Sequence, residues 1–447
     1  MSRAAVVVGG GLAGITAALD LAAAGGRVTL LEARPRLGGA TFSVERDGLW
    51  IDNGQHVFLR CCTAYRTLLE RLGATSRTIL QDRLAIPVLR PGRRVAWLRR
   101  TGLPAPLHLG GSIARFDPLP VRDRLRLLRA VQALRRLSPA DPGLDARSFG
   151  DWLAERGQSP RAREALWNLI TLPTVNLPAE EASLVLAATV FKTGLLDDAA
   201  AADVGYAAEP LQRLHGDAAE RALAAAGVDV RVRCRVRSLA PGPAGWALAW
   251  EGGGIETEAV VLAVPHEDAA GLLPAGALPR GVEPARLGHS PIVDLHVVYD
   301  RRVTELAFAA ALDSPVQWVF DRTASSGLGE GQYLAISLSG ADAYLDLTAE
   351  ELRGRFLPAL AELFPTARDA RVVSFFATRE PKATFRGLPG TAAHRPGPRT
   401  LLPGLYLAGA WTDTGWPATM EGAVRSGAAA ARAATADARL PAAREAA

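Results

Sequence analysis

The chain has 447 residues, of which 49% are hydrophobic and 22% charged, and its formal net charge is +5. A hydrophobic share of this size excludes a disordered polymer and suffices for two or three packed domains. The 44 glycines and 30 prolines follow no fixed period, which excludes a collagen-like repeat. Because Cys61, Cys62 and Cys234 lack the spacing of a zinc site or a disulfide framework, we expect no metal centre and a cytoplasmic location.

Residues 4–32 predict a strand, a tight turn, a helix and a second strand. Ala4–Val8 is a short apolar run typical of a buried parallel strand, Ile15–Ala24 has the composition of a helix, and Arg27–Leu31 is the second strand. The turn reads Gly-Gly-Gly-Leu-Ala-Gly and matches G-x-G-x-x-G, which predicts a dinucleotide site. The expected contacts are Gly9, Gly11, Leu12, Ala13 and Gly14. The alternative is a glycine-rich turn in an unrelated α/β protein.

The spacing of these glycines has a physical reason. Gly9 allows the tight turn, Gly11 lets the backbone approach a pyrophosphate, and Gly14 lets the helix pack closely on the strand. The helix N-terminus presents free N–H groups and the positive end of its dipole to the phosphates. Glu32, at the end of the second strand, is placed to accept hydrogen bonds from ribose hydroxyls.

The segment that begins at Glu32 reads Glu-Ala-Arg-Pro-Arg-Leu-Gly-Gly. It resembles the E-A-R-x-R-x-G-G loop of the amine oxidase and phytoene desaturase superfamily of flavoproteins, in which the loop runs under the pyrophosphate toward the flavin. The resemblance implies FAD as the cofactor. It also implies contacts from Ala33, Arg34, Arg36, Gly38, Gly39 and Ala40, although Ala40 stands where the family often has Arg.

A second segment of the same resemblance lies near the C-terminus. Residues 404–409 read as a strand that ends in a glycine, and Trp-Thr-Asp-Thr-Gly-Trp-Pro-Ala-Thr-Met-Glu-Gly follows from position 411. In the superfamily, a helix begins here beneath the isoalloxazine ring, and a proline suits its first turn. The implied contacts are Gly409, Ala410, Pro417, Ala418, Thr419, Met420 and Ala423, with Ala410 in the place of the usual Asp or Glu. A strand over Val228–Val236 would bring Val236 to the adenine.

These segments predict an α/β fold with a Rossmann-type FAD-binding domain, of the glutathione-reductase-like amine-oxidase type, and an inserted α+β substrate domain. The FAD-binding domain is expected to be discontinuous, over 1–80, 205–275 and 390–437. The insertions 81–204 and 276–389 would form the substrate domain, and 438–447 a tail. The first insertion is expected to be helical. The second is expected to hold strands at Ile292–Tyr299, Val316–Phe320 and Tyr333–Leu338.

Three segments narrow the resemblance. They are Trp-Ile-Asp-Asn-Gly-Gln-His from position 50, Asn-Leu-Ile-Thr-Leu-Pro-Thr-Val-Asn-Leu from position 168, and Thr-Asp-Thr-Gly-Trp-Pro from position 412. Together they resemble the hydroxysqualene dehydroxylase family, the squalene-associated branch, along nearly the whole chain. The resemblance implies reductive removal of an allylic hydroxyl from a C30 isoprenoid, giving squalene for hopanoid synthesis. No second G-x-G-x-x-G follows a strand, so a separate electron donor is expected.

Hydroxide is a poor leaving group, so this reaction needs a proton donor beside the hydride from flavin N5. The candidate donors are Asp413 and His56, with Asp52 orienting its neighbours. Gly54, Gln55 and His56 would line the flavin, and the alternative is that the whole segment only shapes the flavin site. The other histidines are scattered along the chain and are expected to be structural. An apolar pocket is expected, with lining candidates Trp152, Leu166, Trp167, Leu169 and Leu172, for which core packing is the alternative.

Positive charge is concentrated between Arg83 and Arg136, where thirteen arginines stand against two acidic residues. Two explanations of this charge are open. The segment contacts anionic lipid at the inner face of the cell membrane, or it forms an ordinary solvated surface. A helix expected over Val121–Leu137 could lie in the interface through Leu125, Leu127, Leu128 and Leu134, or could simply pack on its domain. No apolar run reaches the ~18 residues of a membrane-spanning helix, and no nucleic-acid partner is expected.

Three rival functions remain open. Carotenoid-type desaturation runs hydride in the opposite direction, from the substrate to the oxidised flavin, and amine oxidation usually requires an aromatic cage. A prenyl-binding escort protein of the same broad fold would carry out no redox chemistry and would lack a complete flavin site. Bound FAD in the purified protein would exclude the escort function.

Overall fold

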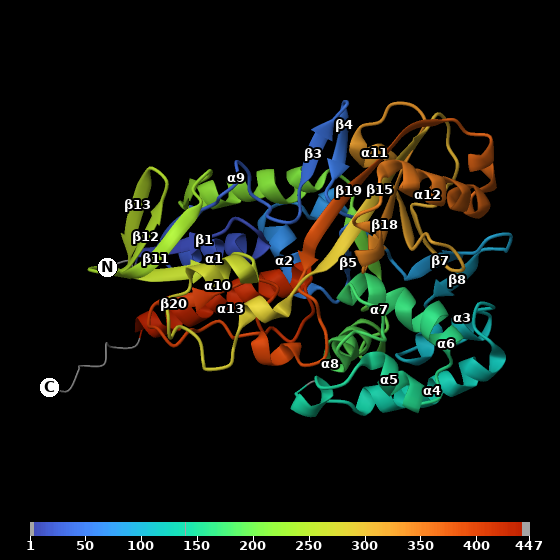
Figure 1. The fold of residues 1–447 in the computed structure, drawn as a ribbon, viewed down its shortest axis with the longest axis horizontal. Coiled ribbons are helices and arrows are strands. Elements are labelled where there is room, and N and C mark those ends of the chain that lie inside the picture. Colours follow the sequence, from blue (N-terminus) through green and yellow to red (C-terminus); the bar gives the residue numbers. More distant parts are fainter. Residues whose placement is uncertain (1–3, 139, 440–447) are drawn as a thin grey trace.

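The computed structural model describes residues 4–138 and 140–439 (Figure 1). The part on the left of Figure 1 is built on a five-stranded parallel sheet, whose strands come from the beginning, the middle and the end of the chain. The Rossmann-type architecture expected from the sequence is therefore confirmed. In order across the sheet, the strands are β10 (Asp229–Arg231), β2 (Arg27–Leu31), β1 (Ala4–Val8), β14 (Ala259–Leu262) and β20 (Leu405–Leu407).

The two faces of this sheet are covered differently. Val7 and Val261 belong to a core shared with the helices α1 (Leu12–Ala23), α9 (Asp217–Ala225) and α13 (Met420–Arg439). Val6 and Val260 point to the opposite face. That face packs against an antiparallel meander of β11 (Val236–Gly242), β12 (Gly245–Trp250) and β13 (Gly253–Thr257). Burial on both faces explains why the central strands are continuously apolar.

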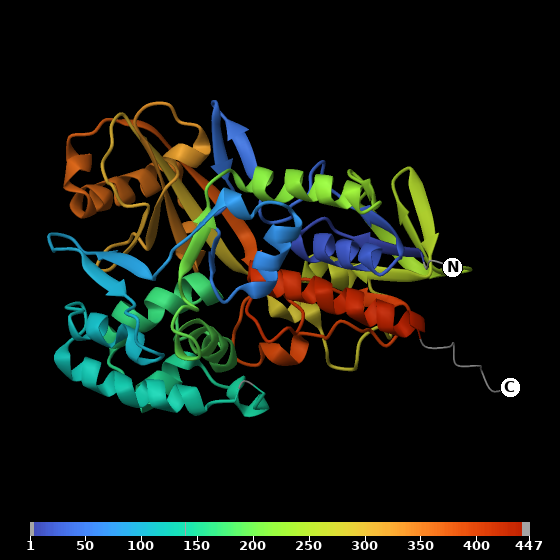
Figure 2. The ribbon, with the colours of Figure 1, turned by 180° about the vertical axis from the view of Figure 1, so that it is seen from behind.

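The first and last long helices of the FAD-binding part lie side by side, as Figures 1 and 2 both show. A Cβ added at Gly427 of α13 would lie 2.1 Å from the carbonyl oxygen of Ala13 in α1, so only glycine permits this approach. The Glu421 carboxylate of α13 accepts hydrogen bonds from the backbone N–H groups of Ala64 and Tyr65, in the first turn of α2 (Thr63–Arg71). The C-terminal segment is therefore anchored beside the N-terminal glycine turn.

The part on the right of Figure 1 contains a seven-stranded mixed sheet. Along β15, Val293, Leu295 and Val297 pack against α12 (Ala349–Leu363). The alternate residues, including Asp294 and His296, point to the other face, toward the FAD-binding part. The strand order is β19 (Val372–Thr384), β15 (Ser290–Tyr299), β18 (Gln332–Ser339), β17 (Trp318–Asp321), β16 (Phe308–Ala311), β7 (Ala85–Leu89) and β8 (Ala96–Arg99).

Smaller elements connect the two parts. The chain forms a hairpin of β3 (Ser43–Arg46) and β4 (Leu49–Asp52), and Ile51 of β4 packs against Val298 and Tyr333 of the large sheet. A three-stranded sheet follows, in the order β5 (Val57–Leu59), β9 (Val204–Ala207) and β6 (Thr78–Leu80). The segment from Asp52 to Val57 thus runs between the two larger sheets.

A helical layer forms the lower right of Figure 1. Its core holds the rings of Phe149, Trp152, Trp167 and Phe191 in mutual contact. Trp152, Leu166, Trp167 and Leu169 belong to this core, in agreement with the core-packing alternative, and Leu172 lies beside Gly340. The helices are α3 (Gly110–Ala114), α4 (Val121–Arg136), α5 (Phe149–Glu155), α6 (Pro160–Ala162), α7 (Asn168–Val175) and α8 (Leu184–Phe191).

Several boundaries differ from those expected. The run Val228–Val236 is not one strand, because the chain turns at Arg233, which has a φ of 59°, and β10 and β11 then belong to different sheets. The first insertion is not purely helical, because β7 and β8 extend the large sheet. Helix α13 continues to Arg439 and so includes the first two positions of the tail expected at 438–447, and residues 440–447 lie outside the described residues. Within the described ranges, no helix is long and apolar enough to span a bilayer.

Candidate functional site

The N-terminal glycine turn forms a narrow cradle of backbone. A Cβ on Gly14 would lie 1.8 Å from the Gly9 carbonyl oxygen, and Gly9 itself has a φ of 108°. Both positions therefore require glycine for packing. Gly11 differs, because a Cβ there would meet no atom closer than the Gly39 Cα, at 3.7 Å. Gly11 is thus the glycine that leaves open space at the N-terminus of α1, beside Leu12 and Ala13, where a phosphate would bind.

The second glycine loop is hydrogen-bonded directly to the first. The Gly38 N–H donates to the Gly10 carbonyl oxygen at 2.9 Å, and Gly39 has a φ of 57°. Arg36 stacks on Phe42, with its guanidinium carbon 3.5 Å from the ring centroid, and donates to the Gly39 carbonyl oxygen. The side chains of Ala33, Arg34 and Ala40 border the same loop, and Ala40 and Arg34 are exposed.

Glu32 organises the adenosine end of this cradle. Its carboxylate is buried and accepts hydrogen bonds from the N–H groups of Gly10, at 2.6 Å, and Arg34, at 2.7 Å. The backbone carbonyl of Glu32 accepts from Cys234, which brings the chain leading to Val236 alongside it. A carboxylate has about four acceptor positions, so two remain for ribose hydroxyls.

The C-terminal flavin segment is held by a residue that the sequence did not single out. Arg395 is buried, and its guanidinium donates to the backbone carbonyl oxygens of Trp411, Thr412 and Trp416. Burial lowers the pKa of Arg395 to about 10, an effect that Asp413 and Asp145 oppose. Arg395 thus organises the loop before Pro417, and no motif marks this arginine.

The flavin contacts predicted in the 409–423 segment lie close together in the structure. Gly409 has a φ of 140°, and its N–H donates to the Ser426 hydroxyl of α13. Ala410, Ala418, Thr419, Met420 and Ala423 are half-buried, and Pro417 is buried. Trp416, Met420 and Ala423 pack against the same apolar cluster that contains Leu12 and Leu37. The two ends of the chain therefore converge, as the sequence analysis requires.

The residues present fit FAD. The glycine cradle excludes side chains where the pyrophosphate would lie, Gly11 caps α1 without a side chain that would compete for the free N–H groups, and Glu32 is placed for the ribose. The residues that would hold the cofactor are those of the two glycine loops, Glu32, Val236 and the 409–423 segment. FAD, when bound, supplies hydride transfer at N5.

A cleft lies where the Asp52–Val57 segment meets the large sheet. It is narrow, with a cavity volume of about 10 Å³, and is lined by Gln55, His56, Tyr206, Phe320 and Arg322, among others. Within the described part of the chain, the buried Gln55 Nε2 has no hydrogen-bond partner, so the cleft offers a donor to a bound group. Phe320, Tyr206, Trp318 and Phe308 form an aromatic cluster at this wall.

Asp52 is committed to a buried ion pair. One carboxylate oxygen lies 2.5 Å from Arg322 Nη2, and the other accepts from the Ser43 hydroxyl and the Leu211 N–H. Arg322 also donates to the Ala207 carbonyl oxygen. Hydrogen-bond donors thus occupy both carboxylate oxygens of Asp52, so Asp52 suits the orienting role predicted for it.

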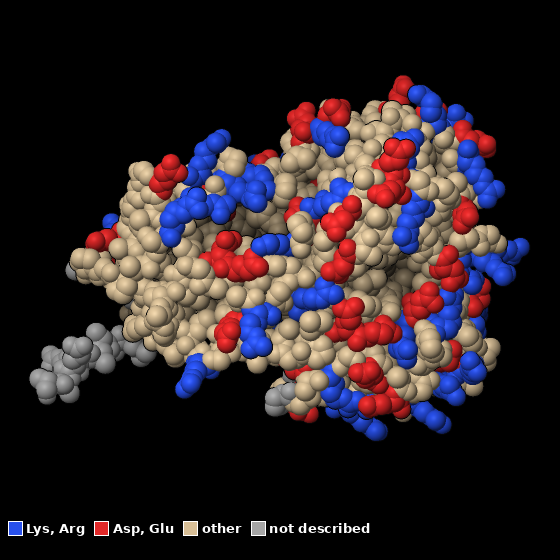
Figure 3. All heavy atoms as spheres, in the orientation of Figure 1, with Lys and Arg blue, Asp and Glu red and all other residues tan. Residues whose placement is uncertain are grey.

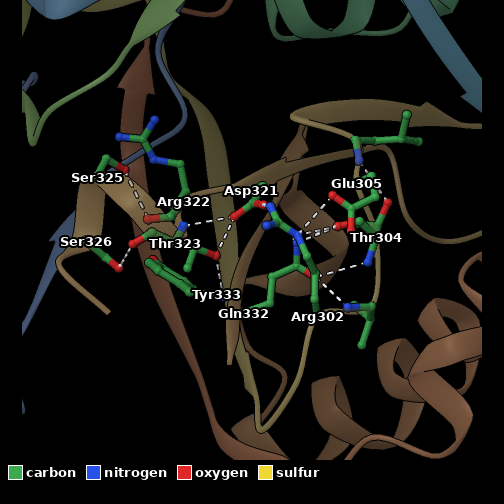
Figure 4. Close-up of polar contacts among 12 residues, drawn as sticks. Arg302, Thr304, Glu305, Asp321, Arg322, Thr323, Ser325, Ser326, Gln332 and Tyr333 are labelled. Carbon is green, nitrogen blue, oxygen red and sulfur yellow. Dashed lines mark hydrogen bonds and ion pairs between the residues drawn. The ribbon is translucent and has the colours of Figure 1, made fainter. Parts of the chain in front are cut away.

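Arg322 is itself fixed by the network at the end of β17 (Figure 4). The preceding residue, Asp321, accepts hydrogen bonds from the N–H and hydroxyl groups of Thr323 and from Gln332 Nε2, and pairs with Arg302. These contacts hold the short helix α11 (Thr323–Ser326) against β18. Arg322, which no sequence motif marked, is thereby directed toward Asp52.

Two titratable side chains meet above Gly54. A Cβ placed on Gly54 would lie 3.3 Å from His56 Nε2 and 3.8 Å from Asp294 Oδ2. Burial lowers the pKa of His56 to about 4, and Arg322 adds to this effect while Asp52 opposes it. Burial raises the pKa of Asp294 to about 8, with a contribution from the carboxylates of Glu380 and Asp52 and an opposing hydrogen bond from Ser337. At neutral pH, His56 is therefore uncharged and Asp294 is protonated.

Asp294 is the acid that the sequence analysis missed. It is 1% exposed, and its Oδ1 has no hydrogen-bond partner among the described residues. The signal was present, since a single Asp interrupts the apolar run Ile292–Tyr299. Asp413, by contrast, is exposed, and its Oδ1 accepts from the Gly415 N–H within its own turn. That turn contact leaves Asp413 a weaker candidate for the proton donor than the sequence suggested.

The histidines are not all scattered in space. The side chains of His266, Glu267 and His289 bring three possible metal-ligand atoms within 4.8 Å of one another. No sequence spacing marks this group, because its residues come from two separated segments, and the absence of a metal centre stays a prediction. Glu267 is also paired with Lys382, so a cation already neutralises this carboxylate.

A parallel sheet, a glycine cradle and a convergent C-terminal segment define an FAD-dependent oxidoreductase. The chain belongs to the family of flavin-containing amine oxidoreductases, whose model matches residues 12–435. It is 30% identical over 423 residues to a hydroxysqualene dehydroxylase of Rhodopseudomonas palustris, which covers 93% of this chain and 94% of that protein. It is 25% identical to a 15-cis-phytoene desaturase of Solanum lycopersicum, covering 91% of this chain and 73% of that protein.

Solved structures show the same fold. A putrescine oxidase matches 98% of this chain and 99% of its own, with a TM-score of 0.74 and 23% identity. A cyclohexylamine oxidase from Brevibacterium oxydans matches 98% of this chain and 100% of its own, with a TM-score of 0.74 and 20% identity. These likenesses concern the fold alone.

Proposed function

We propose that this flavoenzyme removes the allylic hydroxyl of hydroxysqualene reductively and releases squalene, for hopanoid or related triterpenoid synthesis. The observation that carries the proposal is the 30% identity to a hydroxysqualene dehydroxylase along almost the full length of both chains. The reaction needs a hydride, a proton and an apolar site. The chain has a candidate proton donor and a candidate apolar wall.

The proton is assigned to Asp294. Departure of hydroxide is slow unless it leaves as water, so a neutral acid beside the C–O bond is required. Asp294 keeps its proton at neutral pH because it is buried, whereas His56, with a pKa of about 4, does not. Two neighbouring groups whose pKa values are shifted apart are typical of an acid and its partner. His56 in its neutral form would then hydrogen-bond to the substrate oxygen or to water.

The apolar site is assigned to the aromatic wall beside the cleft. Phe308, Trp318 and Phe320 lie on adjacent strands of the large sheet, and Tyr206 approaches Phe308 edge to face. A C30 hydrocarbon has no polar group except its hydroxyl, so its binding depends on such surface. The π faces of these rings would also favour cationic character at the allylic carbon.

The test uses the purified FAD-loaded enzyme, reduced with dithionite without oxygen and mixed with hydroxysqualene. Gas chromatography should detect squalene, with reoxidation of the flavin in equal amount. If the reduced enzyme yields no squalene, and the oxidised enzyme dehydrogenates carotenoid precursors, the desaturase function suggested by the 25% identity to a phytoene desaturase replaces this proposal. Oxidation of amines would favour an amine oxidase, and purified protein without FAD would favour a non-redox prenyl-binding escort.

A further inference from the structure

Large apolar side chains are exposed mainly in one stretch of the first insertion. Among the described residues, eleven large hydrophobic side chains are exposed, and six of these fall between positions 95 and 128. They are Val95, Leu103, Leu107, Val121, Leu125 and Leu128. Single exposed apolar residues are common on soluble proteins, but a concentration of this kind marks an interaction surface.

Helix α4 carries the centre of this surface. Val121, Leu125 and Leu128 are 67%, 68% and 63% exposed, and their spacing of four and three residues puts them on one face of the helix. Leu127 and Leu134 occupy the opposite face and belong to the core. The sequence expectation that Leu127 and Leu134 share the exposed face is therefore wrong, whereas Leu125 and Leu128 do lie on it.

Arginines border this apolar face. Arg122, Arg126 and Arg129 follow one side of the stripe at helical spacing, and Arg135 and Arg136 lie at its C-terminal end. All five are exposed, and within the described ranges none of them has an ion-pair partner. Figure 3 shows arginines along the lower right edge of the molecule, where Figure 1 places α4.

The acidic residues of the segment do not offset this charge. Asp117 is paired with Arg90, and Asp123 is buried and accepts a hydrogen bond from Ser159. The surface is thus apolar along its middle and cationic along its border. Helices with such a face lie in the interface of anionic bilayers, with the apolar side chains among the acyl chains and the arginines at the lipid phosphates.

We infer that the face formed by Val121, Leu125 and Leu128 of α4, with Leu103 and Leu107 beside α3, docks on an anionic lipid bilayer. The short helix η2 (Leu107–Leu109), which carries Leu107, contacts α3, and α3 contacts α4. A second copy of the chain is disfavoured as the occupant, because a symmetric contact would bring arginines against arginines. The inference does not rest on the proposed reaction, since docking is measured without a substrate.

The experiment is vesicle flotation with the full-length, FAD-loaded protein. One set of vesicles contains equal parts phosphatidylglycerol and phosphatidylcholine, and the other contains phosphatidylcholine alone. The wild type should float with the anionic vesicles, and added salt should release part of it because the arginine contribution is screened. The variant L125S/L128S should lose at least about tenfold in partitioning, because it removes the two leucines at the centre of the apolar face. The variant R122Q/R129Q/R136Q should lose the salt-dependent part.

A matched control is V373S/L401S, which changes two apolar residues of similar exposure outside this surface. It should float like the wild type, and the flavin absorbance and melting temperature should be equal in all variants. The inference is overturned if the wild type does not float with anionic vesicles, or if L125S/L128S floats equally well. Self-association that L125S/L128S abolishes, without vesicle binding, would also overturn it and assign the face to a second copy.

Discussion

His56 Nε2 and Asp294 Oδ2 both lie within 4 Å of the point where Gly54 would carry a Cβ, although they belong to different parts of the fold. His56 comes from the segment between β4 and β5, and Asp294 from the middle of β15 in the large sheet. Burial removes the proton of His56 and retains that of Asp294 at neutral pH. This pairing of a neutral base with a neutral acid leads to the first two predictions.

Replacement of Asp294 by asparagine should lower the turnover number by about 10²–10⁴-fold, because the amide keeps the shape but cannot deliver a proton. In the wild type, the rate should fall as the pH rises through about 8, where Asp294 loses its proton. This fall in rate at high pH should be absent in D294N. Single-turnover rates from pH 6 to 10 would measure both effects.

The control is D346N, which changes an exposed aspartate. An ester of the substrate with a good leaving group should restore D294N toward the wild-type rate, because such a group departs without protonation. Equal rates for D294N and wild type on hydroxysqualene would remove Asp294 from the mechanism. Absence of squalene from the wild type would instead reject the proposed reaction.

Gly54→Ala should slow the reaction while leaving the fold and the flavin in place. The added methyl group would lie 3.3 Å from His56 Nε2, which is closer than an ordinary contact, and 3.8 Å from Asp294 Oδ2. The matched substitution is Gly354→Ala in α12, where a methyl group meets no atom within 4 Å. The control should keep full activity and gain about 1 kcal/mol of stability, since alanine favours a helix. An unchanged rate for G54A would show that the reaction does not use this space.

Gly11→Ala should weaken FAD binding, whereas Gly14→Ala should destabilise the fold. At Gly11 the methyl group meets only the Gly39 Cα at 3.7 Å, so the protein should fold but bind FAD weakly, because the methyl group occupies the approach of the pyrophosphate. At Gly14 the methyl group would overlap the Gly9 carbonyl oxygen, so the folded state itself should be destabilised. Thermal unfolding and FAD titration of each apoprotein would separate the two effects. A stable G11A protein with wild-type FAD affinity would contradict the assigned phosphate position.

Removal of one partner of the Asp52–Arg322 pair should cost about 3–5 kcal/mol of unfolding free energy, because the other charge is left buried without compensation. Denaturant unfolding of D52N and R322M would measure this loss. The loss of unfolding free energy in the double variant should be smaller than the sum of the losses in the two single variants, because the double variant leaves no buried charge without a partner. The exposed pair of Arg302 and Glu305 is the comparison, and removal of the Glu305 carboxylate should cost at most about 1 kcal/mol. Equal losses at both pairs would show that burial does not control the effect.

The sequence by itself determined the FAD-binding half of this protein. A glycine turn between a strand and a helix, an acidic residue at the end of the next strand and a proline before the last helix are local requirements of phosphate and flavin approach, so they are visible as short motifs. The strands β1, β2 and β20 and the helices α1 and α4 lie close to where the residue pattern predicted them. Their periodicity and composition depend on neighbouring residues alone.

Only the tertiary structure decided which side chains come together at the candidate site. Asp294, Arg322 and Arg395 belong to no motif, and Asp294 and Arg322 approach residues that lie far away along the chain. The same holds for Leu127 and Leu134, whose burial follows from the domain against which α4 packs. A pKa depends on burial and on charges that approach only after folding. For this reason short sequence motifs predicted the cofactor, whereas the buried carboxyl group of Asp294 could be identified only when β15 was placed against Gly54.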